Sequence, residues 1–134
     1  MTWMAFNGCS YHVPMKRLEG LFPAEEIAYI GAGPKRCQDW KWKKVERMYY
    51  LGESTDPRFP IIEIDKGELD TLLGKIDRKG DAPLVLIHSH QESPREVTGG
   101  DYQTLRLVKT KNQGVIGGIY SVSRKELFFY TTMK

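Results

Sequence analysis

Apolar residues recur at helical spacing in two segments of the chain. Between Pro14 and Phe22, Met15, Leu18 and Leu21 or Phe22 follow the helical period. The clearest helix begins at Asp65, which has capping-box spacing to Glu68. Its apolar residues repeat at i, i+3, i+4 and i+7, namely Leu69, Leu72, Leu73 and Ile76. A further helix is expected from near Thr98 to about Lys111.

Apolar and aromatic runs between these segments predict strands. Pro83 to His88 is a continuous apolar run, typical of a central strand that is buried on both faces. The other predicted strands are Ile27–Gly33, Val45–Leu51, Pro60–Ile64, Gly114–Val122 and Leu127–Thr131. This order predicts an α/β fold in which helices pack on a single, mixed central sheet.

Length and composition restrict the class of protein. The chain has 134 residues, of which 40% are apolar and 28% charged, so we expect one globular domain over 1–134. The net charge of +3 is too small to indicate a partner. We find no apolar run long enough for a membrane span and no signal-peptide pattern at the N-terminus. With Cys9 and Cys37 interpreted as reduced thiols, these features favour a cytoplasmic protein without a membrane partner.

Two histidines at the end of the predicted central strand are the strongest candidates for chemistry. His88 and His90 are separated by one residue, so on a strand both point to the same face, about 7 Å apart. Asp101, at the start of the next predicted helix, could supply a third ligand. Two imidazoles and one carboxylate leave a coordination position for water, which is the pattern of catalytic zinc. Ser89 points to the opposite face and is expected to have a supporting role.

Simpler explanations exist for each part of this pattern. A lone H-x-H is usually structural or lies on the surface. Thr98-Gly99-Gly100-Asp101 also has capping-box spacing, so by itself Asp101 is as good a helix cap as a ligand. Cys9 and His12 form a C-x-x-H spacing, but no second ligand pair follows it.

The full spacing resembles a known family. His88-Ser89-His90, seven residues, Thr98, two residues and Asp101 resemble the motif of the JAMM (JAB/MPN) zinc metallopeptidases, in particular a small prokaryotic-type JAB domain. Upstream, the segment from Pro23 to Gly31 resembles the stretch that carries the family's catalytic glutamate. The resemblance covers roughly residues 14–131, and it implies a mixed sheet with a cytidine deaminase-like core.

The resemblance also implies roles for individual residues. One zinc per chain would be held by His88, His90 and Asp101, Glu25 would be the general base, and Thr98 would stabilise the oxyanion. Glu26 is a rival to Glu25 in the neighbouring position. Two departures are visible: the family usually has Ser at position 98 and Pro at position 91, where this chain has Thr and Gln.

The implied reaction is hydrolysis of a peptide or isopeptide bond. Family substrates include ubiquitin-like proteins and sulfur-carrier proteins with C-terminal glycine tails, so a deubiquitinase-like isopeptidase is one expectation. Two alternatives stay open: a catalytically silent MPN-type binding module, and a RadC-like, DNA-associated relative.

A basic, aromatic segment at Lys35–Lys44 contains Trp40 and Trp42. We predict a polar loop here. Alternating aromatic and basic residues can bind nucleic acid. They are equally compatible with an edge strand that has one packed face, or with a surface for a protein partner, and the sequence favours these over nucleic acid. The oligomeric state does not follow from the sequence.

Overall fold

The structure is a computed structural model, and it describes residues 2–22, 27–37, 40–53, 65–90, 99–110, 112 and 114–132. Its main element is a five-stranded sheet in the order β5-β3-β6-β7-β8. The bounds of these strands are β3 Ile27–Pro34, β5 Arg47–Glu53, β6 Asp81–His90, β7 Ile116–Ser121 and β8 Glu126–Tyr130. The β6–β7 pair is parallel and the other pairs are antiparallel, so the sheet is mixed as predicted.

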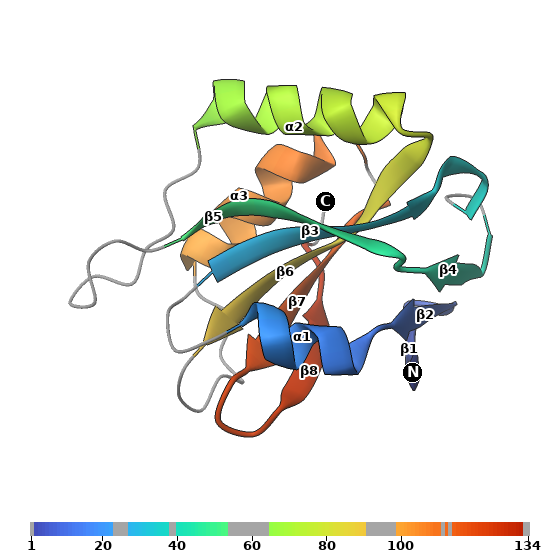
Figure 1. Ribbon diagram of the computed structural model, residues 1–134, viewed down its shortest axis with the longest axis vertical. Coiled ribbons are helices and arrows are strands. Elements are labelled where there is room, and N and C mark those ends of the chain that lie inside the picture. Colours follow the sequence, from blue (N-terminus) through green and yellow to red (C-terminus); the bar gives the residue numbers. More distant parts are fainter. Residues whose placement is uncertain are drawn as a thin grey trace.

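Helices cover both faces of this sheet (Figure 1). α2 (Lys66–Arg78) and α3 (Gly99–Lys109) pack on one face, and α1 (Met15–Leu21) packs on the other. The N-cap of α2 is Asp65, whose side chain accepts a hydrogen bond from the Gly67 N–H at 3.1 Å. The α/β class and these three helices are therefore confirmed.

The core lies between the sheet and these helices, in two layers. Under α2 and α3, Leu69, Ile76 and Leu105 pack against strand residues such as Leu86 and Ile119. Under α1, a second cluster is built around Leu18, Phe22, Val85, Ile87 and Tyr120. β6 contributes to both layers through alternate residues, which explains why its sequence is continuously apolar.

A second sheet was not predicted. β1 (Thr2–Phe6), β2 (Cys9–Val13) and β4 (Trp42–Lys44) form a three-stranded sheet in the order β1-β2-β4. Our expectation of a single sheet is therefore wrong. The N-terminal segment pairs as a β-hairpin, and its inner face packs on the core beneath the larger sheet.

The prediction of a polar loop at Lys35–Lys44 is also wrong in part. Lys35–Cys37 forms a short 3-10 helix, η1, and Trp42–Lys44 is strand β4, which lies parallel to β2. Trp42 and Lys44 are exposed while Lys43 is buried, so the alternative of an edge strand with one packed face is confirmed for these three residues.

The strand predicted at Val45–Leu51 begins two residues later, at Arg47, and the strand predicted at 60–64 lies outside the described residues. β7 is shorter than the predicted strand at 114–122, whereas β8 has the predicted length and lies one residue earlier; a turn at 122–125 joins the two strands. Of the helices described, none is both long and apolar enough to cross a bilayer.

Candidate metal centre

The two candidate histidines lie at the end of the central strand of the larger sheet. β6 is hydrogen-bonded to β3 on one side and β7 on the other, with Ala28 opposite His88 and Ser121 beside His90. His88 is buried, and its ring makes an edge-to-face contact with the Tyr130 ring at a centroid distance of 6.4 Å. Since Tyr130 belongs to the core layer under α2 and α3, His88 faces this layer.

Ser89 lies between the histidines and is turned to the other face of the sheet. Its side chain is completely buried. The Ser89 hydroxyl accepts a hydrogen bond from the Ile27 backbone N–H at 3.0 Å and lies 3.5 Å from the Ile27 carbonyl oxygen. The hydroxyl therefore joins the end of β6 to the first residue of β3, which follows Glu25 by two residues.

The backbone of the remaining candidate ligands is described, but their side chains are not. His90 is the last residue of β6, and strand alternation assigns position 90 to the same face as His88. Asp101 is in the first turn of α3, at the end of that helix where the chain arrives from β6. Position 101 is about one helical turn before Leu105, a buried residue of the layer that His88 faces.

Glu25, Glu26, Gln91 and Thr98 lie outside the described residues. The assembly of Glu25, the three ligands and Thr98 into one site therefore stays a prediction. Among the side chains that the structure does describe, no group of three His, Cys, Asp or Glu residues could hold a metal ion.

The Cys9–His12 spacing does not form a site. Both residues are on β2, three positions apart, so they occupy opposite faces of the strand. Cys9 is a free thiol that packs against the core, whereas His12 lies on the outer side of the small sheet beside the Trp3 ring. The interpretation of this spacing as incidental fits their positions.

A buried carboxylate, Asp81, lies at the opposite end of β6 and was not predicted from the sequence. Asp81 accepts two hydrogen bonds from Arg47 Nη1, both at 2.9 Å, and one from the Tyr49 hydroxyl at 2.9 Å. The hydrogen bond to Asp81 raises the pKa of Arg47, and burial, followed by the hydrogen bond to Asp81, raises the pKa of Tyr49.

This cluster joins β5 to β6 across the intervening strand β3. Since Asp81 is seven residues before His88, the two lie about 23 Å apart along the strand. With three hydrogen bonds from its neighbours, the Asp81 carboxylate is suited to holding strands together. We therefore interpret the cluster as structural and keep the candidate site at the His88 end.

Comparisons with known proteins bear on the fold alone. No protein-family model matches the chain, and no curated protein matches it. Among solved structures, the chain is similar to the solution structure of protein DSY2949 from Desulfitobacterium hafniense, with a TM-score of 0.59 and 20% sequence identity. The match covers 89% of this chain and 80% of the other. At this identity the likeness supports the α/β fold and carries no function.

Proposed function

We propose that this protein is a zinc-dependent metallopeptidase of the JAMM type, which hydrolyses a peptide or isopeptide bond. The observation that carries the proposal is the arrangement at the end of β6. His88 and position 90 share the face that α3 covers, and Asp101 is in the first turn of α3. The intervening Ser89 is turned away and bonded to β3, which leaves this face to the two histidines.

The residues proposed for this site are a donor set that suits zinc. Two imidazoles and a carboxylate are the donor set of open zinc sites. His88 is buried beside an aromatic ring, in surroundings that keep water from most of the imidazole. His88, His90 and Asp101 would hold the ion, which when bound supplies a Lewis acid for the scissile carbonyl and lowers the pKa of water.

The chain's own residues would complete the reaction. Glu25 would remove a proton from the attacking water and deliver it to the leaving amine. The Thr98 hydroxyl would donate a hydrogen bond to the oxyanion that develops on the carbonyl oxygen. The bond from Ser89 to Ile27 supports this assignment, because it holds the segment after Glu25 against the histidine strand.

The substrate that the proposal favours is an extended C-terminal tail rich in glycine, on a ubiquitin-like or sulfur-carrier protein. Such a tail can add to the edge of a sheet through backbone hydrogen bonds, and it has no side chains that must be accommodated near the scissile bond. Hydrolysis at its last carbonyl would release the group attached to the tail.

Metal content tests the proposal before any substrate is known. The purified protein should contain close to one zinc ion per chain by elemental analysis, and His88→Ala should remove most of it. The chain has only three histidines, so His12→Ala is the matched control and should retain the zinc. Negligible zinc in the wild type, or equal zinc in both variants, would overturn the metal site.

A turnover measurement distinguishes an enzyme from a catalytically silent binding module. The probe is a ubiquitin-like protein that carries a fluorogenic amide on its C-terminal glycine. Release of the fluorophore by the wild type, and its loss in Glu25→Gln with zinc retained, supports hydrolysis. A protein that binds zinc and the probe but leaves the amide intact would be a binding module.

A further inference from the structure

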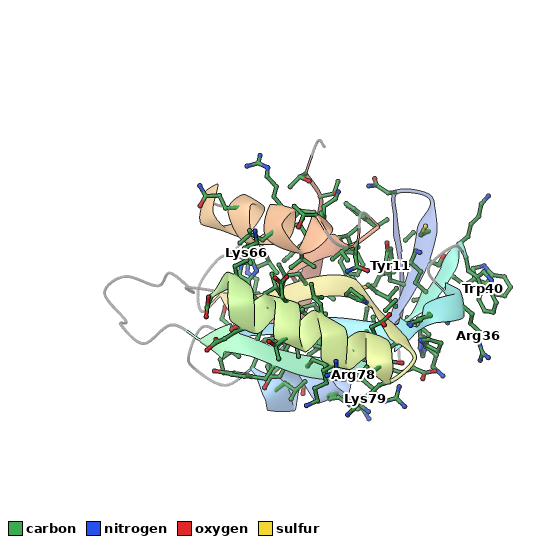
Figure 2. All side chains as sticks on the ribbon, turned by 90° about the horizontal axis from the view of Figure 1, so that it is seen from above. Tyr11, Arg36, Trp40, Lys66, Arg78 and Lys79 are labelled. Carbon is green, nitrogen blue, oxygen red and sulfur yellow. The ribbon has the colours of Figure 1, made fainter. Side chains whose placement is uncertain are left out.

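The outer face of the small sheet β1-β2-β4 carries an exposed aromatic and basic surface. We call this the tryptophan face and define it by Trp3, His12, Trp42 and Lys44. Trp3 is 54% exposed and Trp42 is 68% exposed, which is unusual for side chains of this size. Trp40, in the segment that leads into β4, is 51% exposed. Figure 2 shows Trp40 and Arg36 together at the end of the molecule formed by this sheet.

Strand register explains why these side chains share one face. Trp3 is paired with His12 across β1 and β2, and His12 is paired with Lys44 across β2 and β4. Directly paired residues lie on the same side of a sheet. Trp42 is two residues before Lys44 and lies on this side as well. Trp3 and Trp42 are on the two outer strands, so their backbones are separated by roughly 10 Å across the sheet.

The alternate residues of the same strands point the other way. Met4, Phe6, Cys9 and Tyr11 pack against the core beneath the larger sheet. The two tryptophans are therefore not needed to close this core, and their exposure leaves large apolar rings in water. Such exposure is typical of a binding surface.

His12 supplies an independent indication that this face binds a ligand. Its ring lies against Trp3, with a centroid distance of 4.7 Å, and only 8% of the residue is exposed. Within the described part of the chain, His12 Nδ1 is buried without a hydrogen-bond partner. An unsatisfied buried polar atom is unfavourable, and a ligand that shifts the Trp3 ring as it stacks would give this atom a partner.

The charge around the tryptophan face is positive. Residues 35–47 contain six Lys or Arg and two acidic residues, but three of the basic residues are engaged elsewhere: Lys35 pairs with Asp77, Arg47 pairs with Asp81, and Lys43 is buried on the other side of β4. Lys41 and Lys44 are exposed, and of the acidic residues Glu46 makes a long ion pair with Lys44, at 3.9 Å. The exposed positive charge favours an anionic partner. The exposed rings favour a partner that also presents flat apolar surfaces.

We propose that the tryptophan face binds single-stranded nucleic acid without sequence preference. Trp3 and Trp42 stack on bases, and Lys41 and Lys44 neutralise the phosphates between them. Every base has a π-face that an aromatic ring can stack on, and a charged groove or surface tracks the backbone. A duplex keeps its bases stacked internally, so it cannot use the tryptophans and should bind more weakly.

Fluorescence anisotropy with labelled strands tests the proposal. The probes are a mixed-sequence DNA strand of roughly 20 nucleotides, RNA of the same sequence and the corresponding DNA duplex. Trp3→Ala and Trp42→Ala should each weaken binding of the single strand about tenfold, while Trp42→Phe should largely retain it. Lys44→Ala should reduce the slope of log affinity against log salt by about 0.7.

Two control variants are placed elsewhere on the surface. Leu107 is an exposed apolar residue on α3, and Lys66 lies at the start of α2, away from the small sheet (Figure 2). Leu107→Ala and Lys66→Ala should leave the affinity unchanged within about twofold. Circular dichroism of each variant confirms that the fold is retained. The relative affinities for the DNA strand and the RNA strand show which of the two nucleic acids the tryptophan face prefers.

Three results would overturn the proposal. The first is that no strand binds at low salt. The second is that Trp3→Ala and Trp42→Ala leave the affinity for the strands unchanged. The third is that an acidic peptide or anionic vesicles bind more tightly than the strands and depend on the same tryptophans. The last result would assign the face to a protein or a membrane. The experiment needs no catalysis, so its outcome is independent of the proposed metallopeptidase activity, and Glu25→Gln should bind strands as the wild type does.

Discussion

The Ser89 hydroxyl accepts a hydrogen bond from the backbone N–H of Ile27, 3.0 Å away, where both residues are buried. The two residues are 62 positions apart in the sequence. Their contact fixes the end of β6, which carries both histidines, against the start of β3. The glutamate proposed as general base comes two residues before Ile27, so this bond is the described link between the two parts of the candidate site.

Ser89→Ala should destabilise the protein by about 1–3 kcal/mol, because the Ile27 N–H loses a buried acceptor. Urea denaturation of the two proteins measures the difference. Ser123 is an exposed serine in the β7–β8 turn whose hydroxyl makes only a long hydrogen bond, of 3.4 Å, with the Ser121 hydroxyl, which also has the Arg124 N–H as a partner. Ser123→Ala is therefore the control and should change stability by less than about 0.5 kcal/mol. Equal stability of wild type and Ser89→Ala would show that this bond contributes nothing to the fold.

Gly33→Ala should destabilise the protein, because Gly33 lies where the two sheets approach each other closely. A Cβ at position 33 would collide with the backbone carbonyl oxygen of Lys44 and would lie 3.1 Å from Leu84 Cδ1. Because a backbone atom cannot move aside as a flexible side chain does, we expect a loss of at least about 1–3 kcal/mol. Gly20→Ala is the matched control.

Gly20 is an exposed residue of α1, and a Cβ there meets no atom within 4 Å. Alanine favours a helix over glycine by up to about 1 kcal/mol, so Gly20→Ala should raise the melting temperature while Gly33→Ala lowers it. Thermal unfolding of both variants decides the matter. A shift of the same sign in both would mean that position 33 has room for a methyl group.

The protein should lose stability at alkaline pH through Tyr11. Burial, together with the charge of nearby Cys9, raises the pKa of Tyr11 from its usual 10 to about 12. Unfolded Tyr11 ionises near pH 10 but folded Tyr11 does so only near pH 12. Its contribution to stability is therefore constant below pH 10 and is lost as the pH rises from about 10 to about 12.

Urea midpoints measured across this pH range test the effect. Tyr11→Phe cannot ionise, so its stability should fall less steeply than that of the wild type. Other groups titrate in the same range, and the comparison of the two slopes isolates Tyr11. Parallel slopes for wild type and Tyr11→Phe would place the ionisation of Tyr11 outside this range.

The elements that the sequence predicted well are those that a local pattern determines. α2 has a cap at Asp65 and one apolar stripe, and β6 is a continuous apolar run with core on both sides. The N-terminal hairpin was missed although a signal for it exists. Asn7 and Gly8 both have positive φ, of 50° and 78°, and Asn-Gly is the residue pair that such two-residue hairpin turns prefer.

Other features depend on contacts that no local pattern records. β4 has three residues, and it is a strand because β2 lies beside it. Asp81 obtains its partners from residues 32 and 34 positions away, so its burial could not be expected from its neighbours in the chain. In the candidate site, alternation along β6 predicted the common face of positions 88 and 90. How Glu25 and Thr98 approach this face depends on segments that lie outside the described residues.

Substitutions at Glu25 and Glu26 test the register of the proposed base. Glu25→Gln should abolish hydrolysis with zinc content intact, because a base is removed and a ligand is not. Glu26→Gln should be far milder, since adjacent residues in an extended chain point to opposite sides. Zinc analysis and turnover of the fluorogenic probe are measured on both variants. An inactive Glu26→Gln beside an active Glu25→Gln would shift the assignment by one residue.

Thr98 stands where the JAMM motif that the sequence resembles usually has serine, and two roles compete for its hydroxyl. As the N-cap of α3, which begins at Gly99, it would accept a hydrogen bond from a backbone N–H in the first turn. As an oxyanion donor, it would act only when the carbonyl oxygen becomes negative. The first role affects folding and the second affects the rate.

Thr98→Ala separates these roles. Loss of a cap alone should lower stability by about 1 kcal/mol with turnover nearly unchanged. Loss of a donor should lower kcat by about 10² or more, and this is the result we expect. Thr98→Ser is the control, because it keeps the hydroxyl and should retain both stability and rate. Thermal melts and steady-state rates of the two variants decide the outcome. A destabilised but fully active Thr98→Ala would remove Thr98 from the catalytic set, because an oxyanion donor cannot be deleted without raising the barrier.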